Sequence, residues 1–311
     1  MRTAYLVVLA LAGAALVLLG APTWLALGSG LALALVSGQP APKQIRKLTT
    51  YSLQLGVIAL GAGMDLEVVV RTGLDGALIT ATSLATAIVL GLQLGKWLRV
   101  AGDTPLLVSV GTAICGGSAI AAVAALLQPK EEETSIALAV VFVFNAIGLV
   151  LFPLLGHALG LSQVVFGRWA ALAIHDTSSV VGAGMAYGAV ALGIATATKL
   201  ARALWIVPTT IGVAVMRHRD TRGKLRDVRW PWFIAGFVAV AALVTWVPEI
   251  RAHAEPAVTV GRRLMVAALY LIGVSLSRKA LATVGARPLV MGLILWIVIA
   301  SVSLPLAMFT G

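Results

Sequence analysis

Residues Ala173-Ile174-His175-Asp176-Thr177-Ser178-Ser179 place five consecutive polar side chains inside an apolar stretch that extends from 163 to 192. An ionisable group buried in a bilayer is costly, so an intramembrane aspartate indicates a functional site. Asp-Thr-Ser-Ser is also a favourable sequence for starting a helix, because short polar side chains cap free backbone N–H groups. We therefore expect one half-helix to end near Ile174 and a second to begin after Asp176.

A second break is expected within Gly111-Thr112-Ala113-Ile114-Cys115-Gly116-Gly117-Ser118-Ala119. Each glycine costs about 1 kcal/mol of helix stability relative to alanine, and non-helical backbone at membrane depth persists only within protein or beside water. The second half-helix would present free N–H groups and a positive dipole end, which suit an anion. The alternative is close helix packing through small residues. Cys115 is the single cysteine, so no intrachain disulfide can form.

Composition indicates an all-α polytopic membrane protein. Of the 311 residues, 60% are hydrophobic and 11% are charged, and the mean hydropathy is +1.00; soluble domains carry about 25% charged residues. The net charge of +11 does not indicate nucleic-acid binding, because the basic residues occupy short breaks between apolar runs. We expect residues 1–311 to form a single transmembrane domain.

About eleven membrane spans are predicted from apolar runs of sufficient length, two of them discontinuous. Their ranges are 4–20, 23–38, 48–64, 76–95, 104–127, 135–156, 163–192, 196–215, 231–248, 260–276 and 286–308. We interpret the N-terminal apolar run as the first span and not as a cleaved signal peptide, because another apolar run follows it closely.

Charge alternation predicts the orientation. Most basic residues fall in breaks that share one side if the N-terminus is cytoplasmic, including the segment 217–229, whereas the Glu131–Glu133 run falls on the other side. The predicted location is the inner membrane of a bacterium, with the C-terminus outside. We expect 163–192 to cross completely, because a hairpin there would place 217–229 outside, against the charge rule.

An inverted repeat is suggested by residues 56–66 and 266–276. Both combine an apolar run with a glycine, Gly63 or Gly273, and a break after a leucine. The two segments fall in the third and tenth predicted spans, which run in opposite directions, as an inverted repeat requires.

Two cations follow the His-Asp break on one predicted helix. Lys199 and Arg202 are three residues apart, so they share a face. They could lie near a membrane edge and extend their charged ends to water. The alternative, which we favour, is that Lys199 pairs with Asp176 and Arg202 binds an anionic substrate, because arginine suits bidentate recognition of an oxyanion.

The segments GTAICGGSAIAAVA (111–124), HDTSSVVGA (175–183), TKLARALWIVP (198–208) and FNAIGLVLFPLLG (144–156) resemble the YeiH-like bacterial membrane proteins, a family named for sulfate export. That resemblance covers most of the chain. It implies a fold of the bile-acid-symporter and sodium/proton-antiporter type, with inverted repeats, two broken helices that cross, and a core domain that moves against a panel domain. Crossing helices of that type run antiparallel, whereas the fifth and seventh predicted spans would run parallel.

The leading hypothesis is a secondary transporter that moves a small anion, such as sulfate or a related sulfonate or carboxylate, coupled to H⁺ or Na⁺. The expected substrate cradle comprises Cys115, Gly116, Gly117, Ser118, Thr177, Ser178, Ser179 and Arg202, and the expected coupling residues are His175, Asp176 and Lys199.

Two alternatives remain: a cation/proton antiporter that uses Asp176 and Lys199, and a membrane scaffold or sensor that transports nothing. An enzyme is not expected, because adjacent His, Asp and Ser residues point in different directions and no HExxH or GxSxG motif is present. The expected partners are the anion, the coupling ion and membrane lipid, without cofactor, metal or nucleic acid; a homodimer is compatible with the sequence.

Overall fold

The computed structural model describes the chain except residues 1, 39–42, 76, 217–231, 276–283 and 310–311. The described part is helical and contains no strand. Its helices are α1 (Arg2–Leu18), α2 (Thr23–Ser37), α3 (Lys43–Leu60) with the 3-10 turn η1 (Gly61–Gly63), α4 (Leu66–Asp75), α5 (Ala77–Trp97), α6 (Thr104–Ala113), α7 (Gly117–Leu127), α8 (Glu131–Ala158), α9 (Gln163–Ala173), α10 (Thr177–Tyr187), α11 (Ala189–Ala203), α12 (Ile206–Met216), α13 (Trp232–Trp246), α14 (Pro248–Ala252), α15 (Glu255–Ser275) and α17 (Ala286–Phe309).

Five helical segments in the described part are long and apolar enough to cross a membrane. They are Ile79–Trp97, Glu131–Ala158, Ala189–Val213, Glu255–Ser275 and Ala286–Phe309. Shorter apolar helices accompany them, including α2, α13 and the half-helices α6 and α7. The half-helices α9 and α10 have 11 residues each. Each predicted span range thus contains helix, but the two broken segments do not follow the predicted path.

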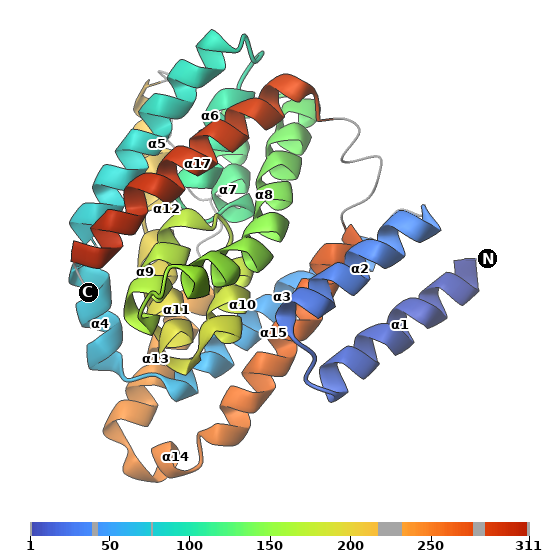
Figure 1. Cartoon of the computed structure of the whole chain (residues 1–311), viewed down its shortest axis with the longest axis vertical. Coiled ribbons are helices and arrows are strands. Elements are labelled where there is room, and N and C mark those ends of the chain that lie inside the picture. The colour runs from blue at the N-terminus through green and yellow to red at the C-terminus, as the bar shows by residue number, and fades with distance from the viewer. Residues whose placement is uncertain (1, 39–42, 76, 217–231, 276–283, 310–311) are drawn as a thin grey trace.

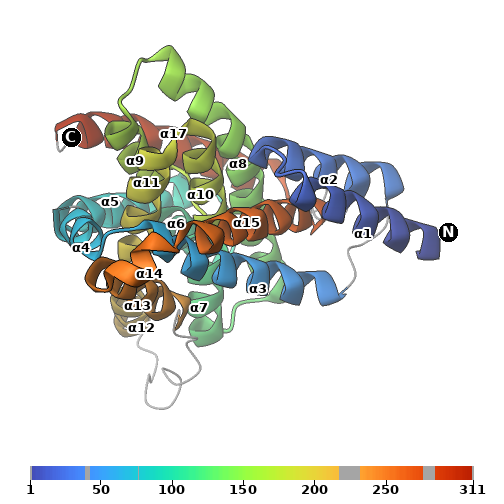
Figure 2. The same ribbon diagram turned by 90° about the horizontal axis from the view of Figure 1, so that it is seen from below.

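In both views α1 and α2 lie at one edge of the molecule, and α4 and α5 lie at the opposite edge (Figure 1, Figure 2). Helix α15 packs against α2 and α3. Glycines permit this close approach: a methyl group on Gly261 would lie 3.0 Å from the Gly56 carbonyl oxygen, and one on Gly30 would lie 3.0 Å from the Val274 amide nitrogen.

Helices α3 and α15, which contain most of the suggested repeat, run in opposite directions. The methyl position on Gly261 lies against Gly56 and Leu60 of α3, and Val258, nearer the start of α15, lies against Gly63 beyond the end of α3. Antiparallel packing is what an inverted repeat needs, and the repeat itself stays a prediction.

Residues 104–127 form a re-entrant hairpin, which we call hairpin 1, and do not cross completely. The Asp103 amide, just before α6, donates to Glu133 Oε2 at 3.4 Å, near the start of α8. An Ile120 side-chain carbon of α7 lies 2.8 Å from a methyl position on Gly111 of α6. Thus α7 returns beside α6 and leaves at the end where α6 began.

Residues 163–187 form a second re-entrant hairpin, hairpin 2, which corrects the expectation of a complete crossing. Tyr187 Oη, at the end of α10, donates to the Leu161 carbonyl before α9 at 2.6 Å. The rings of Tyr187 and Phe166 stack with centroids 3.7 Å apart. A continuous helix of this length would separate its ends by about 35 Å, so the contacts require α10 to reverse.

The two hairpins enter from opposite ends of the molecule, and their tips meet between those ends. Helix α8 runs beside both: along its length it contacts the base of hairpin 1, then the two tips, then the base of hairpin 2. The contacting residues of α8, in that order, are Glu133, Val141, Asn145 and Gly156. Helices α11 and α12 also follow both hairpins, from Gly167 of α9 through the tips to α7.

Two hairpins reverse the chain twice, so they preserve the predicted alternation of every later crossing. A single reversal at 163–192 would invert every later crossing, and the reversal in hairpin 1 cancels that effect. The Glu131–Glu133 run does change sides, because it begins α8 beside Asp103. The segment 217–229 lies outside the described residues.

Candidate functional site

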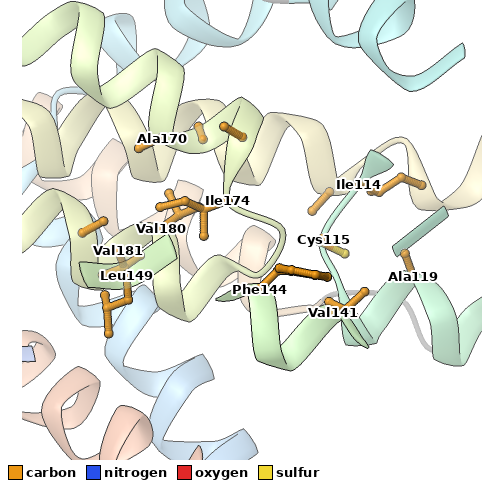
Figure 3. Close-up of a cluster of buried hydrophobic side chains, with 14 of the residues drawn as sticks. Ile114, Cys115, Ala119, Val141, Phe144, Leu149, Ala170, Ile174, Val180 and Val181 are labelled. Carbon is orange, nitrogen blue, oxygen red and sulfur yellow. The ribbon is translucent and has the colours of Figure 1, made fainter. Parts of the chain in front are cut away.

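The tips of the two hairpins are in contact, as the sequence predicted for the two breaks. A methyl group on Gly116 would lie 3.3 Å from Asp176 Cβ and 3.4 Å from Asp176 Cα. Figure 3 shows Cys115 and Ile174 on loops that face each other, with Val141 and Phe144 of α8 beside them. We call this region the tip junction. The expected crossing of two broken helices is replaced by a meeting of two hairpins.

The tips share a sequence pattern as well as a shape. Hairpin 1 reads Ala113-Ile114-Cys115-Gly116-Gly117-Ser118, and hairpin 2 reads Ala173-Ile174-His175-Asp176-Thr177-Ser178. In each case the first arm ends at the alanine, the isoleucine is its C-cap, and the fourth residue is the N-cap of the returning arm. The two tips therefore present corresponding positions to the junction.

Arg202 of α11 joins the ends of the two first arms. Its Nε donates to the Ala113 carbonyl at 2.6 Å, and Nη2 reaches the Thr112 carbonyl at 3.4 Å, both on hairpin 1. Its Nη1 donates to carbonyls of hairpin 2 at 2.5 Å and 3.2 Å, those of Leu172 and Ala171. Four N–H···O contacts occupy most of a guanidinium's five donors. The arrangement thus favours holding the tips together over the expected binding of substrate.

Lys199, one turn before Arg202 on α11, donates to the free carbonyls at the end of α9. Its ammonium nitrogen donates to the Ile174 carbonyl at 2.8 Å and to the Ala171 carbonyl at 3.2 Å. Trp296 of α17 supplies a further donor, because its Nε1 donates to the Ala173 carbonyl at 3.0 Å. The expected direct pair between Lys199 and Asp176 is not formed between these two described side chains, because the ammonium bonds to backbone carbonyls instead.

The placement of these cations follows from helix electrostatics. The last carbonyls of a helix lack intrahelical partners and carry about half a negative charge together. Lys199 and Arg202 are fully buried, with exposed fractions of 0%. A buried cation must be compensated, and the carbonyl ends of α6 and α9 provide that compensation. The shared helix face predicted for the two residues is confirmed, since both reach Ala171.

Asp176 fills the amino end of α10. Its Oδ2 accepts hydrogen bonds from both the backbone N–H and the hydroxyl of Ser178. Its own N–H donates to Asn145 Oδ1 at 3.0 Å. Thr177, Ser178 and Ser179 are buried, whereas Asp176 is half-buried. Hairpin 2 therefore carries its own anion at the position where a helix attracts one.

The amino end of α7 differs, because its N-cap is Gly116 and no side chain caps it. The backbone of Gly116 has φ 66° and ψ −124°, a conformation that disfavours any residue with a side chain. The first amides of α7, Gly117 and Ser118, accordingly have no hydrogen-bond partner within the described chain. Ser118 is exposed and Cys115 is buried. Hairpin 1 thus presents free donors where hairpin 2 presents a satisfied cap.

Several buried polar atoms around the junction also have no partner within the described structure. They are Asn145 Nδ2, both ring nitrogens of His175, and Thr112 Oγ1, and these residues are exposed by 3%, 1% and 1% respectively. Buried polar groups in proteins are normally hydrogen-bonded, so such a cluster requires an explanation. A polar solute or a transferable proton would satisfy these atoms.

Two residues of the junction were not assigned to the site from the sequence. Asn145 accepts the Asp176 amide through its Oδ1, and its Nδ2 has no partner in the described structure. Trp296 gave no signal in a strongly apolar helix. The polarity of Asn145 in the middle of an apolar run was a usable signal. A search of the described residues finds no group of His, Cys, Asp and Glu side chains that could hold a metal ion.

Comparison with known proteins identifies the family. Residues 6–292 match the family described as Conserved hypothetical protein 698. A UPF0324 membrane protein of Bdellovibrio bacteriovorus is 49% identical over 281 residues, covering 90% of this chain and 86% of that protein. Relatives with the same description occur in Geobacter sulfurreducens, at 42% identity with 90% and 88% of the two chains covered, and in Vibrio vulnificus, at 42% identity with 93% of each.

No solved structure matches the sequence. The relatives are described as membrane proteins, and the structure contains several apolar helices of spanning length. The chain is a multi-pass membrane protein that belongs to the UPF0324 family.

Proposed function

We propose that this protein is a secondary transporter that carries a small anion through the tip junction. The observation that supports this most strongly is the charge balance there. Two fully buried cations, Lys199 and Arg202, bond the carbonyl ends of the first arms, and one carboxylate, that of Asp176, caps α10. Two helix N-termini and two C-termini contribute about half a charge each and cancel. With the three side chains ionised, the junction holds one net positive charge, which an anion would neutralise.

The hairpin arrangement supports transport. The bases of the two hairpins lie at opposite ends of the molecule. One hairpin therefore lies between the junction and each end. A movement of the hairpins relative to α2, α3 and α15 would open the junction to one side at a time, as alternating access requires. In this proposal the hairpin-plus-helix units 104–158 and 163–216 form an inverted repeat. The N-terminus is cytoplasmic, because basic residues gather in the loops on its side.

Coupling is assigned to the groups that can exchange a proton or bind a cation. Asp176 is half-buried and therefore accessible, and His175 has two ring nitrogens without hydrogen-bond partners in the described chain. Imidazole and carboxylate groups are the usual proton carriers in transporters. We propose H⁺ or Na⁺ as the coupling ion, with the substrate held near Gly117 and Ser118. Sulfate, sulfonates and carboxylates are the candidate substrates.

The test is flux into liposomes that contain the purified protein. Labelled sulfate, methanesulfonate and acetate are offered with an H⁺ gradient, with a Na⁺ gradient, or with neither, and protein-free liposomes provide the background. The proposal expects gradient-dependent uptake of at least one anion. Na⁺/H⁺ exchange without anion movement would replace it with cation/proton antiport. No flux of any solute would replace it with a scaffold or sensor.

A further inference from the structure

The two tips share the Ala-Ile pair that ends the first arm and the serine of the returning arm, and they differ in how the returning arm is capped. In hairpin 2 the N-cap residue is Asp176, whose carboxylate occupies the amino end of α10. In hairpin 1 the N-cap residue is Gly116, and the amino end of α7 has no side-chain cap. The serine that donates to the carboxylate, Ser178, is buried, and the residue at the same position of hairpin 1 is Ser118, which is exposed.

We infer that the solute anion binds hairpin 1 as the Asp176 carboxylate binds hairpin 2. This inference rests on the proposed function and assigns the contacts and the substrate class. One oxygen of the anion accepts from the backbone N–H and the hydroxyl of Ser118, as Asp176 Oδ2 accepts from those of Ser178. Gly117 provides a further free N–H at the same helix end.

A separate feature also points to a ligand at this place. Asn145 is 3% exposed, and its Oδ1 accepts from the Asp176 amide at the tip of hairpin 2. The Asn145 Nδ2 has no partner in the described structure. The same Asp176 contacts the N-cap of α7, because its Cα lies 3.4 Å from a methyl position on Gly116. A second oxygen of the anion would satisfy this donor.

The charge balance specifies the class of anion. With Lys199, Arg202 and Asp176 ionised, as in the proposed function, the junction carries one net positive charge, so a monovalent anion neutralises it and a dianion leaves one uncompensated negative charge within the membrane. The donors require an oxyanion group with at least two acceptor oxygens. The site is therefore suited to a carboxylate or sulfonate, in preference to sulfate.

Gly116 explains why the protein does not supply this anion itself. Its φ of 66° strains any residue with a side chain, and a Cβ there would lie only 3.3 Å from Asp176 and from Val141. The site can therefore be filled by a diffusing anion and emptied again, whereas the equivalent site of hairpin 2 is permanently occupied. Reversible occupancy is what a transport site needs.

Binding can be measured without a membrane gradient. The unfolding temperature of the purified protein in detergent is followed by tryptophan fluorescence against increasing methanesulfonate, acetate, sulfate or chloride at constant ionic strength. A ligand that binds the native state raises this temperature as its concentration exceeds Kd. The inference expects methanesulfonate and acetate to bind at least about tenfold more tightly than sulfate and chloride.

Two variants test the location, and a third provides a matched control. Ser118→Ala removes the hydroxyl donor and should raise the Kd of methanesulfonate about tenfold, since a hydrogen bond to a charged group is lost. Ser118→Asp places a tethered carboxylate at the amino end of α7 and should abolish the shift while the protein remains folded. Ser29→Ala alters a serine of α2 that bonds only its own helix, and should bind as the wild type does.

The outcomes separate the binding inference from the transport proposal. Unchanged binding in both Ser118 variants, or tighter binding of sulfate than of methanesulfonate, would overturn the inference even if the liposomes show flux. Normal Ser118-dependent binding without flux would overturn the proposed transport and leave the site standing.

Discussion

Replacing Arg202 should loosen both hairpin tips, because one guanidinium holds the last carbonyls of α6 and α9. In Arg202→Leu the carbonyls of Thr112, Ala113 and Leu172 lose the donor that the structure gives them. Each buried carbonyl without a partner costs about 1–3 kcal/mol. Relief of the desolvation of the guanidinium offsets part of this loss. We expect a net loss of at least about 3 kcal/mol, in the range seen when one member of a buried charged contact is removed.

The assay combines thermal unfolding with amide hydrogen exchange in detergent. At about 2 °C per kcal/mol for a chain of this size, Arg202→Leu should unfold at least about 6 °C below the wild type. Hydrogen exchange of the backbone amides should accelerate at Ile114 and at Ile174, which lie on different tips. Lys199→Met should accelerate exchange at Ile174 alone, because Lys199 bonds only to hairpin 2.

Arg262→Leu, at an exposed position of α15, provides the control for loss of an arginine and should change neither measurement. An Arg202→Leu protein that unfolds within about 2 °C of the wild type, with normal exchange at both tips, would refute the reasoning.

Three further substitutions test the charge balance and the packing. Asn145→Asp keeps an acceptor for the Asp176 amide but cancels the net positive charge, so anion uptake into liposomes should fall at least about tenfold; normal uptake would contradict the charge argument. Asp176→Asn should leave the free energy of unfolding within about 1 kcal/mol of the wild type, because asparagine also caps helices. The variant should retain anion binding but lose gradient-driven uptake; uptake that still follows the gradient would show that Asp176 is only a cap. Gly30→Ala should destabilise the contact between α2 and α15 by about 1–3 kcal/mol in urea unfolding, whereas Gly28→Ala, in open space on the same helix, should be neutral; equal effects would exclude the packing explanation.

The sequence predicts the breaks and their meeting because local chemistry determines both. Paired glycines at Gly116-Gly117 disfavour continuous helix, and the Asp176 to Ser179 run favours a new helix start. Both breaks expose backbone N–H and C=O groups that need hydrogen-bond partners in a bilayer, so a contact between the two breaks could be expected. The common helix face of Lys199 and Arg202 follows from their spacing alone.

The direction of the chain after each break is not encoded locally. A returning half-helix and a continuing one need the same caps and the same apolar composition. Contacts between residues far apart decide the matter, such as those of Tyr187 with Leu161 and of Asp103 with Glu133. The charge rule did not expose the error, since two reversals leave the sides of all loops after hairpin 2 unchanged and move only the segments between the hairpins, such as the Glu131–Glu133 run.

The partners of the buried cations were also beyond the sequence. A cation near an aspartate suggests an ion pair, but the free carbonyls at a helix end are an equally good counterpart in a medium of low polarity. Once two hairpins place two such ends together, Arg202 can serve both, and no pattern in the sequence signals that arrangement.

The most direct measurement of the central claim is the sidedness of the hairpin bases. In a Cys115→Ser background, single cysteines replace Leu159 and Val190 at the two ends of hairpin 2, where both positions are exposed, and Ala101 and Lys130 at the two ends of hairpin 1. A membrane-impermeant maleimide is applied to right-side-out and to inverted vesicles. The account predicts that positions 159 and 190 are labelled in the same vesicles and that positions 101 and 130 are labelled together in the opposite ones. Labelling of 159 and 190 from opposite sides would mean that the segment crosses the membrane, and the account of two hairpins meeting at their tips would be wrong.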